Sequence, residues 1–423
     1  MAFGRSKGIN MRDAVIISAV RTPVGRYLGA LKEVPAHDLG ALVLKESLDR
    51  LGLDPSAVDE VIMGQSYQSG EYVNVARMAL LKAGWPEAVP GITLDRRCCT
   101  GLDVVCFAAM KIQSGNADLV VAGGVESMST AELYLPGEIK WGIGGRKGMP
   151  RGHGDLSMWG IPLYDRIQRA RVMSQPVERY GTLPSMMTWA ETAAQEEGIS
   201  REDCDRWALA SHQKACAAIS EGRFDHEIVP VAVPRPKGDS VLVTQDEGPR
   251  EDTSLEKLAG LKPVLGGVCT AGNSSTENDG SAVVVVTAAD NAERLGVEPL
   301  GILKSFAVAG DDPRKAYKTV PSAVRKALDR AGLTLEDMDL IEIQEAFAAQ
   351  VLADLKEMGV GPEDYNKVNV NGSGISLGHP IACTGTRVLV TLLHEMQRRK
   401  ARYGLECICG GGGLGIAAIV ERI

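Results

Sequence analysis

A weak internal repeat is the feature of this sequence that most constrains its fold. Residues 47–62, which read SLDRLGLDPSAVDEVI, resemble residues 327–342, which read ALDRAGLTLEDMDLIE. Asp59 then faces Asp339, an offset of 339 − 59 = 280 residues. In both segments a helical pattern leads through a glycine into a strand-like run, so the same local structure is predicted twice.

Two more pairs of segments keep the same order along the chain. Residues 99–101, Cys-Thr-Gly, face residues 383–385, also Cys-Thr-Gly, at an offset of 284. Gly123-Gly124 faces Gly411-Gly412 at an offset of 288. Because the offset grows in small steps while the order holds, we predict a duplicated α/β unit with short insertions. Chance similarity of helix–glycine–strand patterns is the alternative.

Alternation of short apolar runs with helical patterns also indicates the α/β class. Runs rich in β-branched residues, such as 283–286 and 416–420, alternate with helical stretches of about a dozen residues. At 423 residues the chain exceeds what one hydrophobic core usually serves. We therefore predict an N-terminal half over 1–135 plus 262–290 and a C-terminal half over 291–423.

Residues 136–261 interrupt the first half and differ from it in composition. They begin with a stretch rich in Gly and Pro, then contain many Arg, Met and Trp residues, and include an amphipathic segment at 200–220. A loop-rich insertion of this length in an α/β unit is usually functional. We predict a loop domain that covers the active site.

The charge balance argues against a general nucleic-acid binder. The formal net charge is −8 and the pI is about 5.5, whereas neutralising phosphates requires a basic surface; a local basic patch for a phosphorylated cofactor stays open. No run approaches the roughly 20 apolar residues of a membrane span, and no signal-peptide core follows the basic residues near the N-terminus. We expect a cytoplasmic protein with no membrane partner, and Met11 as a possible natural start that makes residues 1–10 a loose extension.

The cysteines do not form a metal-binding pattern. The nine of them contain neither a CxxC pair nor a zinc-ligand spacing, so we expect reduced thiols and no metal site. A free cysteine is more often a small buried hydrophobe than a nucleophile. That is the expectation for Cys106, Cys204, Cys216 and Cys269.

Cys98 differs from the other cysteines in its place along the chain. It lies where a strand-like run meets a helix that is apolar nearly all round, in the segment Asp-Arg-Arg-Cys-Cys-Thr-Gly. A buried helix N-terminus presents free backbone N–H groups. The helix dipole and the preceding Arg96 and Arg97 are expected to lower the pKa of the Cys98 thiol and favour the thiolate.

A histidine stands at the matching place in the second half. His379 precedes Pro380 at a glycine-rich helix entrance, in the segment NVNGSGISLGHP. By the repeat it is equivalent to the Cys98 region. In a two-fold arrangement the two helix N-termini converge, which would put imidazole beside thiol, as an activated nucleophile requires. The alternative is an exposed loop histidine.

Two further segments carry groups that suit acyl chemistry. Cys409 ends a strand and runs into Gly410–Gly413, where free backbone amides could hold an anion. A nucleotide-phosphate loop is the alternative, but the pattern matches neither GxGxxG nor GxxxxGK[ST]. Gln344 and Phe347 end another strand with a carboxamide and an aromatic ring, which solvent exposure and core packing would also explain.

Together these segments resemble the thiolase family over nearly the whole chain, from about Asp13 to Ile423. The motifs that carry the resemblance are CCTG at 98–101, GGVESMS at 123–129, TAGNSSTENDGSA at 270–282, QEAFA at 344–348, NVNGSGISLGHP at 369–380 and CGGGGLG at 409–415. The resemblance implies a five-layered α-β-α-β-α fold of two duplicated halves, with an inserted loop domain that holds coenzyme A. It also implies homodimers or homotetramers.

The resemblance implies the reaction and the role of each residue. A thiolase reversibly cleaves a 3-oxoacyl-CoA to acyl-CoA and acetyl-CoA, with coenzyme A as a co-substrate and no permanently bound cofactor. Cys98 would be the acylated nucleophile, His379 its activator and Cys409 the acid/base. The amides of Cys98 and Gly411 would form one oxyanion hole, and His379 with a water held by Gln344 the other. Residues implied to line the acyl or pantetheine channel are Met186, Ser275 and Phe347.

Three departures from the family pattern bear on the substrate. Gln344 stands where the family usually has Asn or His, Ser185 stands where short-chain biosynthetic members have His, and residues 317–321 lack the glycines of the family's MGxGP stretch. These departures favour a degradative enzyme with a substrate bulkier than acetoacetyl-CoA.

Two other functions would use part of the same set of residues. The first is a ketoacyl synthase-type condensing enzyme, which typically uses Cys with two His, or with His and Asn, and lacks a second catalytic thiol. The second is a non-catalytic thiolase-like subunit that binds CoA or a partner, which would be expected to lose one of the thiols or the histidine. The presence of Cys98, His379 and Cys409 together favours the thiolase.

Overall fold

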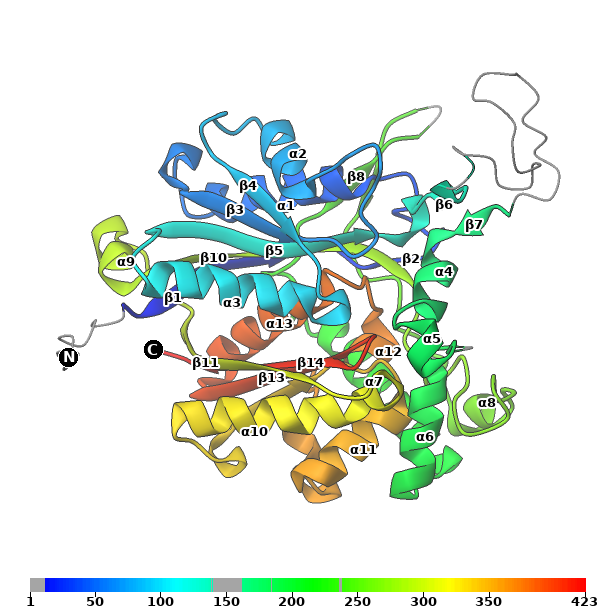
Figure 1. The fold of residues 1–423 in the computed structure, drawn as a ribbon. Helices are drawn as coiled ribbons and strands as arrows, with labels where there is room; N and C mark the ends of the chain where they lie inside the picture. The colour runs from blue at the N-terminus through cyan, green and yellow to red at the C-terminus, as the bar shows by residue number, and fades with distance from the viewer. Residues whose placement is uncertain (1–11, 138, 140–161, 184, 236–237) are drawn as a thin grey trace, which may run out of the picture.

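The computed structural model describes residues 12–137, 139, 162–183, 185–235 and 238–423. The possible extension at residues 1–10 and most of the Gly- and Pro-rich start of the insertion lie outside the described residues. Figure 1 shows the described elements stacked in five layers, helix–sheet–helix–sheet–helix. The predicted fold class is therefore confirmed.

The first half supplies the upper layers in Figure 1. Its sheet has the order β4-β3-β5-β10-β1, and α1 and α2 cover the outer face. The elements are β1 (Ala14–Arg21), α1 (Ala36–Asp49), β3 (Glu60–Gly64), α2 (Val75–Lys82), β4 (Gly91–Leu94), α3 (Thr100–Gln113), β5 (Leu119–Ser127) and β10 (Asn278–Ala288). The short β2 (Gly25–Arg26) pairs with β10. Val, Ile and Leu fill the space between this sheet and its outer helices, as a sheet buried on both faces requires.

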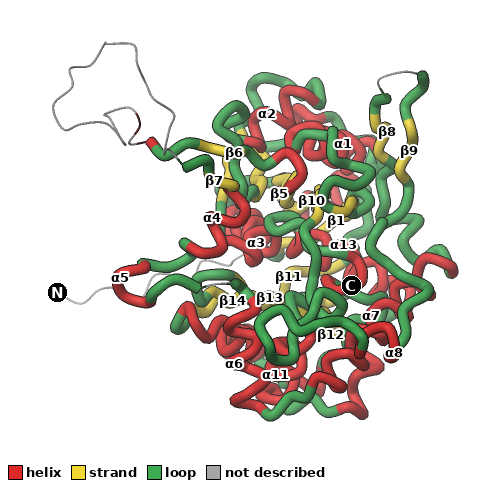
Figure 2. The backbone as a smooth tube through the Cα atoms, turned by 90° about the vertical axis from the view of Figure 1, so that its right-hand side faces the viewer, coloured by secondary structure: helices red, strands yellow, loops and turns green. Residues whose placement is uncertain are grey.

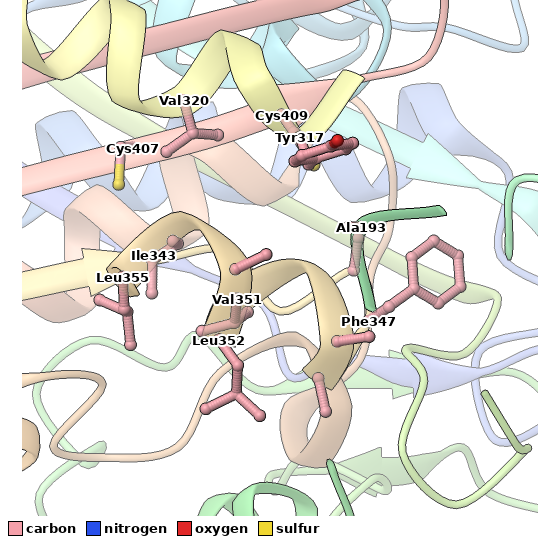
Figure 3. Close-up of a cluster of buried hydrophobic side chains, with 14 of the residues drawn as sticks. Ala193, Tyr317, Val320, Ile343, Phe347, Val351, Leu352, Leu355, Cys407 and Cys409 are labelled. Atoms are coloured by element: carbon pink, nitrogen blue, oxygen red, sulfur yellow. The ribbon is translucent and has the colours of Figure 1, made fainter. Parts of the chain in front are cut away.

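The second half repeats this arrangement below. Its strands run in the order β12-β13-β14-β11, and α10 and α11 cover the outer face. The elements are β11 (Gly301–Gly310), α10 (Thr319–Ala331), β12 (Leu340–Ile343), α11 (Ala348–Met358), α13 (Thr384–Arg399), β13 (Tyr403–Gly410) and β14 (Leu414–Glu421). Figure 3 shows Val351, Leu352 and Leu355 of α11 among the labelled side chains of the cluster that packs α11 on this sheet. The two sheets join where Val15 pairs with Ile302 and Ile16 with Gly301.

The repeat is visible in the hydrogen bonds at the start of the paired strands. Asp59 Oδ2 accepts the N–H groups of Asp118 and Leu119 at 2.7 and 3.0 Å. In the second half, a carboxylate oxygen makes the same two bonds at the same distances: Asp339 Oδ2 accepts the N–H groups of Arg402 and Tyr403 at 2.7 and 3.0 Å. The two halves therefore share a specific structural device as well as a general pattern.

The strand register corrects one part of the sequence alignment. Val61 pairs with Val121, and Ile341, which is equivalent to Val61 at the offset of 280, pairs with Leu405. The offset between β5 and β13 is therefore 405 − 121 = 284, the same as for the Cys-Thr-Gly segments. The predicted match of Gly123 with Gly411, at an offset of 288, is wrong, because the glycines of 411–413 form the turn after β13 rather than part of the strand.

That turn has a topological counterpart in the first half. β13 and β14 are antiparallel neighbours joined directly by residues 411–413. Their counterparts β5 and β10 are also antiparallel neighbours, but residues 128–277, which include the insertion, connect them. The glycine turn and the insertion therefore begin at the ends of equivalent strands, β13 and β5, and this brings both to the same region of the molecule.

The described part of the insertion runs along one side of both halves. Figure 2 shows β8 (Val231–Val233) and β9 (Val241–Val243) near α1, and α6 (Met187–Glu197) and α8 (Leu255–Ala259) at the opposite end. The remaining helices of the insertion are α4 (Arg166–Val172), α5 (Val177–Tyr180) and α7 (Arg201–Ser220).

A buried ion pair network attaches the insertion to the first half. Arg21, at the end of β1, is fully buried and donates to Glu227 at 2.6 Å and to both oxygens of Asp246 at 2.7 and 2.9 Å. Burying a charge is costly unless it is paired and hydrogen-bonded. Removing one partner of this network would therefore loosen the attachment of the insertion.

The central layer is formed by α3 and α13, which cross at a pair of glycines. A Cβ on Gly101 would lie 2.6 Å from the amide nitrogen of Thr386, and one on Gly385 would lie 2.3 Å from that of Leu102. The threonine also bonds across the crossing, because Thr386 Oγ1 donates to the carbonyl of Gly101 at 2.7 Å. Only glycine permits this approach, and it brings the starts of both helices together.

We expect Gly385→Ala to destabilise the protein by about 1–3 kcal/mol, because the added methyl group meets backbone atoms that cannot rotate away. Urea denaturation of the variant would measure the change. Gly260→Ala is the matched control, because a Cβ there meets its nearest atom at an ordinary 3.5 Å. Equal stability of the two variants would contradict the importance of the glycine crossing.

Candidate active site

A cavity of about 520 Å³ lies where the two central helices begin. Cys98, His379 and Cys409 all line it, together with Gly411 of the glycine turn. The insertion contributes a large part of the wall: Ala170, Arg171, Ser174, Ser185, Met186, Met187, Trp189 and Arg250. The volume falls within the usual range for small-molecule sites, so this is the candidate active site.

Cys98 lies in a tight bend at the start of α3. Arg97, the residue before it, has a left-handed φ of 54°, which is unfavourable for a side chain of this size. Asp95 stabilises the bend, since its Oδ1 accepts the N–H of Arg97 at 2.8 Å. Strained residues of this kind are concentrated at functional sites. Here the bend presents Cys98 to the cavity.

The structure corrects the expected ionisation of this thiol. Burial raises the pKa of Cys98, and this effect exceeds the lowering by a hydrogen bond from the Gly411 amide and by the charge of Arg97. The sequence predicted the opposite direction, because it shows the arginine and the helix but not the desolvation. Cys98 is therefore a thiol at neutral pH and needs a base to become a nucleophile.

His379 is placed to be that base. Its Nε2 lies 3.3 Å from Cys98 Sγ, and its Nδ1 lies 2.6 Å from Thr384 Oγ1. The Thr384 hydroxyl donates its proton to the carbonyl of Pro380 at 2.9 Å, so it accepts from the histidine. This assigns the proton of the imidazole to Nδ1 and leaves the lone pair of Nε2 facing the thiol.

The surroundings of His379 keep the imidazole neutral. Burial, with the positive charges of Arg387 and Arg171, lowers the pKa of His379 to about 3. At pH 7 the ring is therefore unprotonated and its Nε2 lone pair is available. The low pKa alone makes the ring a weak base, so proton transfer relies on the thiolate that forms beside the imidazolium as its counter-charge. Its backbone N–H donates to Asn278 Oδ1 at 2.9 Å, which holds the turn in place. The predicted convergence of imidazole and thiol is found, and the exposed-histidine alternative is not.

Cys409 is the second thiol of the cavity. It is the last residue but one of β13, is 2% exposed, and belongs to the buried cluster of the second half shown in Figure 3. Burial and the nearby carboxyl of Asp354 raise the pKa of Cys409 well above its usual value. It is a protonated thiol at neutral pH, and a thiol is able to donate a proton to a more basic group.

The residues predicted to contact the substrate are distributed as follows. Met186, Ser275 and Phe347 all line the cavity, and Gly411 faces the sulfur of Met186. Gln344 is not in the cavity wall: it is fully buried, and neither atom of its amide has a hydrogen-bond partner among the described residues. The side chain of Gln344, which is one methylene longer than that of Asn, is packed close to Gly374.

Two residues at this site were missed by the sequence reasoning. Thr384 sets the tautomer of His379, and Asn278 holds the backbone of the same turn. Thr384 lies in the repeated Cys-Thr-Gly and Asn278 in the TAGNSSTENDGSA stretch. Their spacing from His379 gave no signal, because one contact is a local turn and the other spans 101 residues.

Within the described ranges, no group of three or more His, Cys, Asp or Glu side chains could hold a metal ion. In the same parts of the chain, every helix falls short of the length and hydrophobicity that a bilayer span requires.

The arrangement is suited to acyl transfer. A thiol beside a neutral imidazole provides a nucleophile with its base. A second thiol provides a separate proton donor, and the backbone amide of Gly411 is directed at the nucleophilic sulfur. Preorganised amides of this kind stabilise the charge that develops on a carbonyl oxygen under attack.

Comparison with known proteins agrees with this chemistry. The chain matches the thiolase N-terminal domain over residues 14–290 and the thiolase C-terminal domain over residues 297–422. The solved structure of an acetyl-CoA acetyltransferase from Bacillus anthracis is similar to it, with a TM-score of 0.89, 41% identity, and coverage of 98% of this chain and 100% of that one.

Curated relatives are similar over their whole length. An acetyl-CoA acetyltransferase of Cupriavidus necator is 45% identical over 414 residues, which cover 97% of this chain and 100% of the relative. A probable acetyl-CoA acyltransferase of Staphylococcus aureus is 42% identical over 414 residues, with the same coverage. The two domain matches and these relatives show that this chain belongs to the thiolase family of acyltransferases.

Proposed function

We propose that this enzyme cleaves a 3-oxoacyl-CoA with coenzyme A, giving an acyl-CoA and acetyl-CoA, and catalyses the reverse condensation. The observation that carries the proposal is the 3.3 Å contact between His379 Nε2 and Cys98 Sγ, with the tautomer assigned by Thr384. A neutral base in contact with a protonated thiol is the ground state from which a thiolate forms by one proton transfer.

The first half of the reaction forms an acyl-enzyme. His379 takes the thiol proton, and Cys98 Sγ attacks the 3-oxo carbon. The amides of Cys98 and Gly411 hold the resulting oxyanion. The bond between C2 and C3 then breaks, leaving the acyl group on Cys98 and the electron pair on the enolate of acetyl-CoA. Cys409 protonates C2, and His379 stabilises the enolate oxygen. Gln344 lies outside the cavity wall with its amide unpaired among the described residues, so it would take part only through a water between it and the cavity.

The second half releases the product. The thiol of coenzyme A gives its proton to the Cys409 thiolate and attacks the acyl carbon on Cys98. The acyl group passes to coenzyme A, and the Cys98 thiolate recovers its proton from His379. Each group thus returns to its starting state. Coenzyme A acts as a co-substrate, and no permanently bound cofactor takes part.

The cavity supports an acyl group bulkier than acetyl. Its apolar wall includes the flexible side chains Met128, Met186 and Met187, which adapt to irregular ligands. Ser185 lines the same wall in place of the histidine expected of a short-chain biosynthetic member. Both features favour a degradative role. The names of the relatives from B. anthracis and C. necator favour acetyl transfer instead, so acetoacetyl-CoA is the second candidate substrate.

The cavity also offers cations for the phosphates of coenzyme A. Arg26 and Arg250 line it, and the structure gives neither of them an ion pair among the described residues. We propose that they belong to the local basic patch that an acidic protein needs for a phosphorylated co-substrate. We further propose a cytoplasmic homodimer or homotetramer with no nucleic-acid or membrane partner, as the family resemblance implies.

A panel of 3-oxoacyl-CoA substrates with increasing chain length, and one with an aromatic ring, tests the proposed reaction. We expect release of acyl-CoA and acetyl-CoA, with kcat/KM at least about tenfold higher for a longer substrate than for acetoacetyl-CoA, because each added methylene gains apolar contact. Chromatography of the products measures both. A preference for acetoacetyl-CoA would reject the bulkier substrate, and no turnover with any substrate would reject the function.

Variants of the two thiols test their separate roles. With acetyl-CoA as acyl donor, Cys98→Ala should form no acyl adduct in intact-mass spectra, whereas Cys409→Ala should form the adduct and then stall, with kcat reduced by about 10³-fold or more. Cys216→Ala is the control and should behave as the wild type, because this residue of α7 is only partly buried and lies outside the cavity. An acetyl adduct on the Cys98 variant would contradict the assignment of Cys98 as the acylated nucleophile.

Thr384→Val tests the assigned tautomer. The variant keeps the branched shape but removes the oxygen that accepts the hydrogen bond from His379 Nδ1–H. The proton is then no longer held on Nδ1, and the Nε2 lone pair is no longer fixed toward Cys98. We expect kcat to fall by about 10²-fold, the lower end of a general-base contribution, while Thr384→Ser retains most activity. Steady-state thiolysis measures both variants, and a valine variant as active as the serine variant would contradict the role of the hydroxyl.

A further inference from the structure

A buried carboxylate outside the cavity wall connects the two catalytic segments. Glu126, near the end of β5, is fully buried. Its Oε1 accepts the N–H of Tyr67 at 3.0 Å. Its Oε2 accepts the N–H of Ser66 and the N–H of Ala382, each at 3.1 Å. Ser66 and Tyr67 belong to the first half of the molecule and Ala382 to the second, so one side chain bridges both halves.

On one side, Glu126 holds the turn that carries His379. Ala382 lies three residues after the histidine, in the turn that begins α13. The turn is packed closely on β5, because a Cβ on Gly124 would lie 1.8 Å from the carbonyl oxygen of Ala382. Ala382 is thus held to β5 twice: its carbonyl packs against Gly124, and its N–H donates to the Glu126 carboxylate.

On the other side, Glu126 is linked to the bend that carries Cys98. The hydroxyl of Ser66 donates to Asp95 Oδ1 at 2.9 Å. The same oxygen accepts the N–H of Arg97 at 2.8 Å, and Arg97 is the left-handed residue directly before the nucleophile. A continuous set of hydrogen bonds therefore runs from the histidine turn through Glu126 to the cysteine bend.

We propose that Glu126 is a positioning residue that holds Cys98 and His379 at proton-transfer distance by bonding the backbone of both segments. The inference rests on the proposed function, in which His379 deprotonates Cys98. A carboxylate suits this place because both of its oxygens accept, whereas a carboxamide would turn an NH₂ group toward a backbone N–H. Burial raises the pKa of Glu126 to about 7, so the group is ionised above that pH.

Glu126→Gln tests the proposal at pH 8. We expect kcat for thiolysis to fall at least about tenfold with KM changed less than about threefold, since no substrate contact is lost. The rate of Cys98 alkylation by iodoacetamide should fall by a similar factor, and its pH midpoint should rise, because the base is displaced. Alkylation needs no acyl-CoA turnover, so it tests the positioning even if the proposed substrate is wrong.

Glu132→Gln is the matched control. Glu132 also accepts a backbone N–H in the same segment, that of Gly70 at 2.9 Å, but it is partly exposed and does not reach the histidine turn. In the Glu132→Gln variant, iodoacetamide should alkylate Cys98 at the wild-type rate. If Glu126→Gln lowers only the thermal stability and Cys98 is still alkylated at the wild-type rate, the residue is merely structural and the proposal is overturned.

Ser66→Ala covers the case in which the Glu126 variant does not fold. The Ser66 hydroxyl bonds Asp95 at an exposed position, so the alanine variant should still fold. The substitution removes the hydrogen bond that connects Ser66 to Asp95 and should slow Cys98 alkylation by about threefold. An unchanged alkylation rate in this variant would overturn the proposal.

Discussion

The crossing of α3 and α13 at Gly101 and Gly385 is the constraint on which the site depends. Each glycine leaves room for the backbone of the other helix, so the two helix starts lie side by side. One start carries Cys98 and the other follows His379. The Cys98–His379 pair is therefore assembled by the packing of the two halves rather than by either alone, and its members stand at equivalent helix entrances of the repeated unit.

Burial of the three reacting groups explains the protonation states at the site. Burial raises the pKa of both Cys98 and Cys409 and lowers that of His379, since desolvation disfavours whichever form is charged. The three reacting groups are therefore neutral at rest: two thiols and an imidazole. On these groups charge appears only during the reaction, and the Gly411 amide already points at Cys98, which is how a preorganised site stabilises a transition state.

The sequence predicted what depends on pattern and missed what depends on desolvation or contact. The repeat predicted the two halves and the meeting of Cys98 with His379, because both follow from equivalent helix starts. The pKa direction of Cys98 was wrong, since the neighbouring arginines are visible in the sequence but the burial is not. Thr384 and Asn278 were missed because a hydroxyl or carboxamide has no periodicity that marks it as a partner of a histidine.

The departure from symmetry between the halves is as informative as the repeat. β5 and β13 are equivalent strands, yet β13 turns back through three glycines whereas β5 leads into the insertion. Because the two exits are equivalent, the glycine turn and the insertion meet at one cavity, where Gly411 faces Met186. The glycine turn places a backbone amide at Cys98, and the insertion supplies a large part of the cavity wall. The two equivalent exits therefore differ in what they bring to the cavity: a backbone amide from the short glycine turn, and side chains such as Met186 from the long insertion.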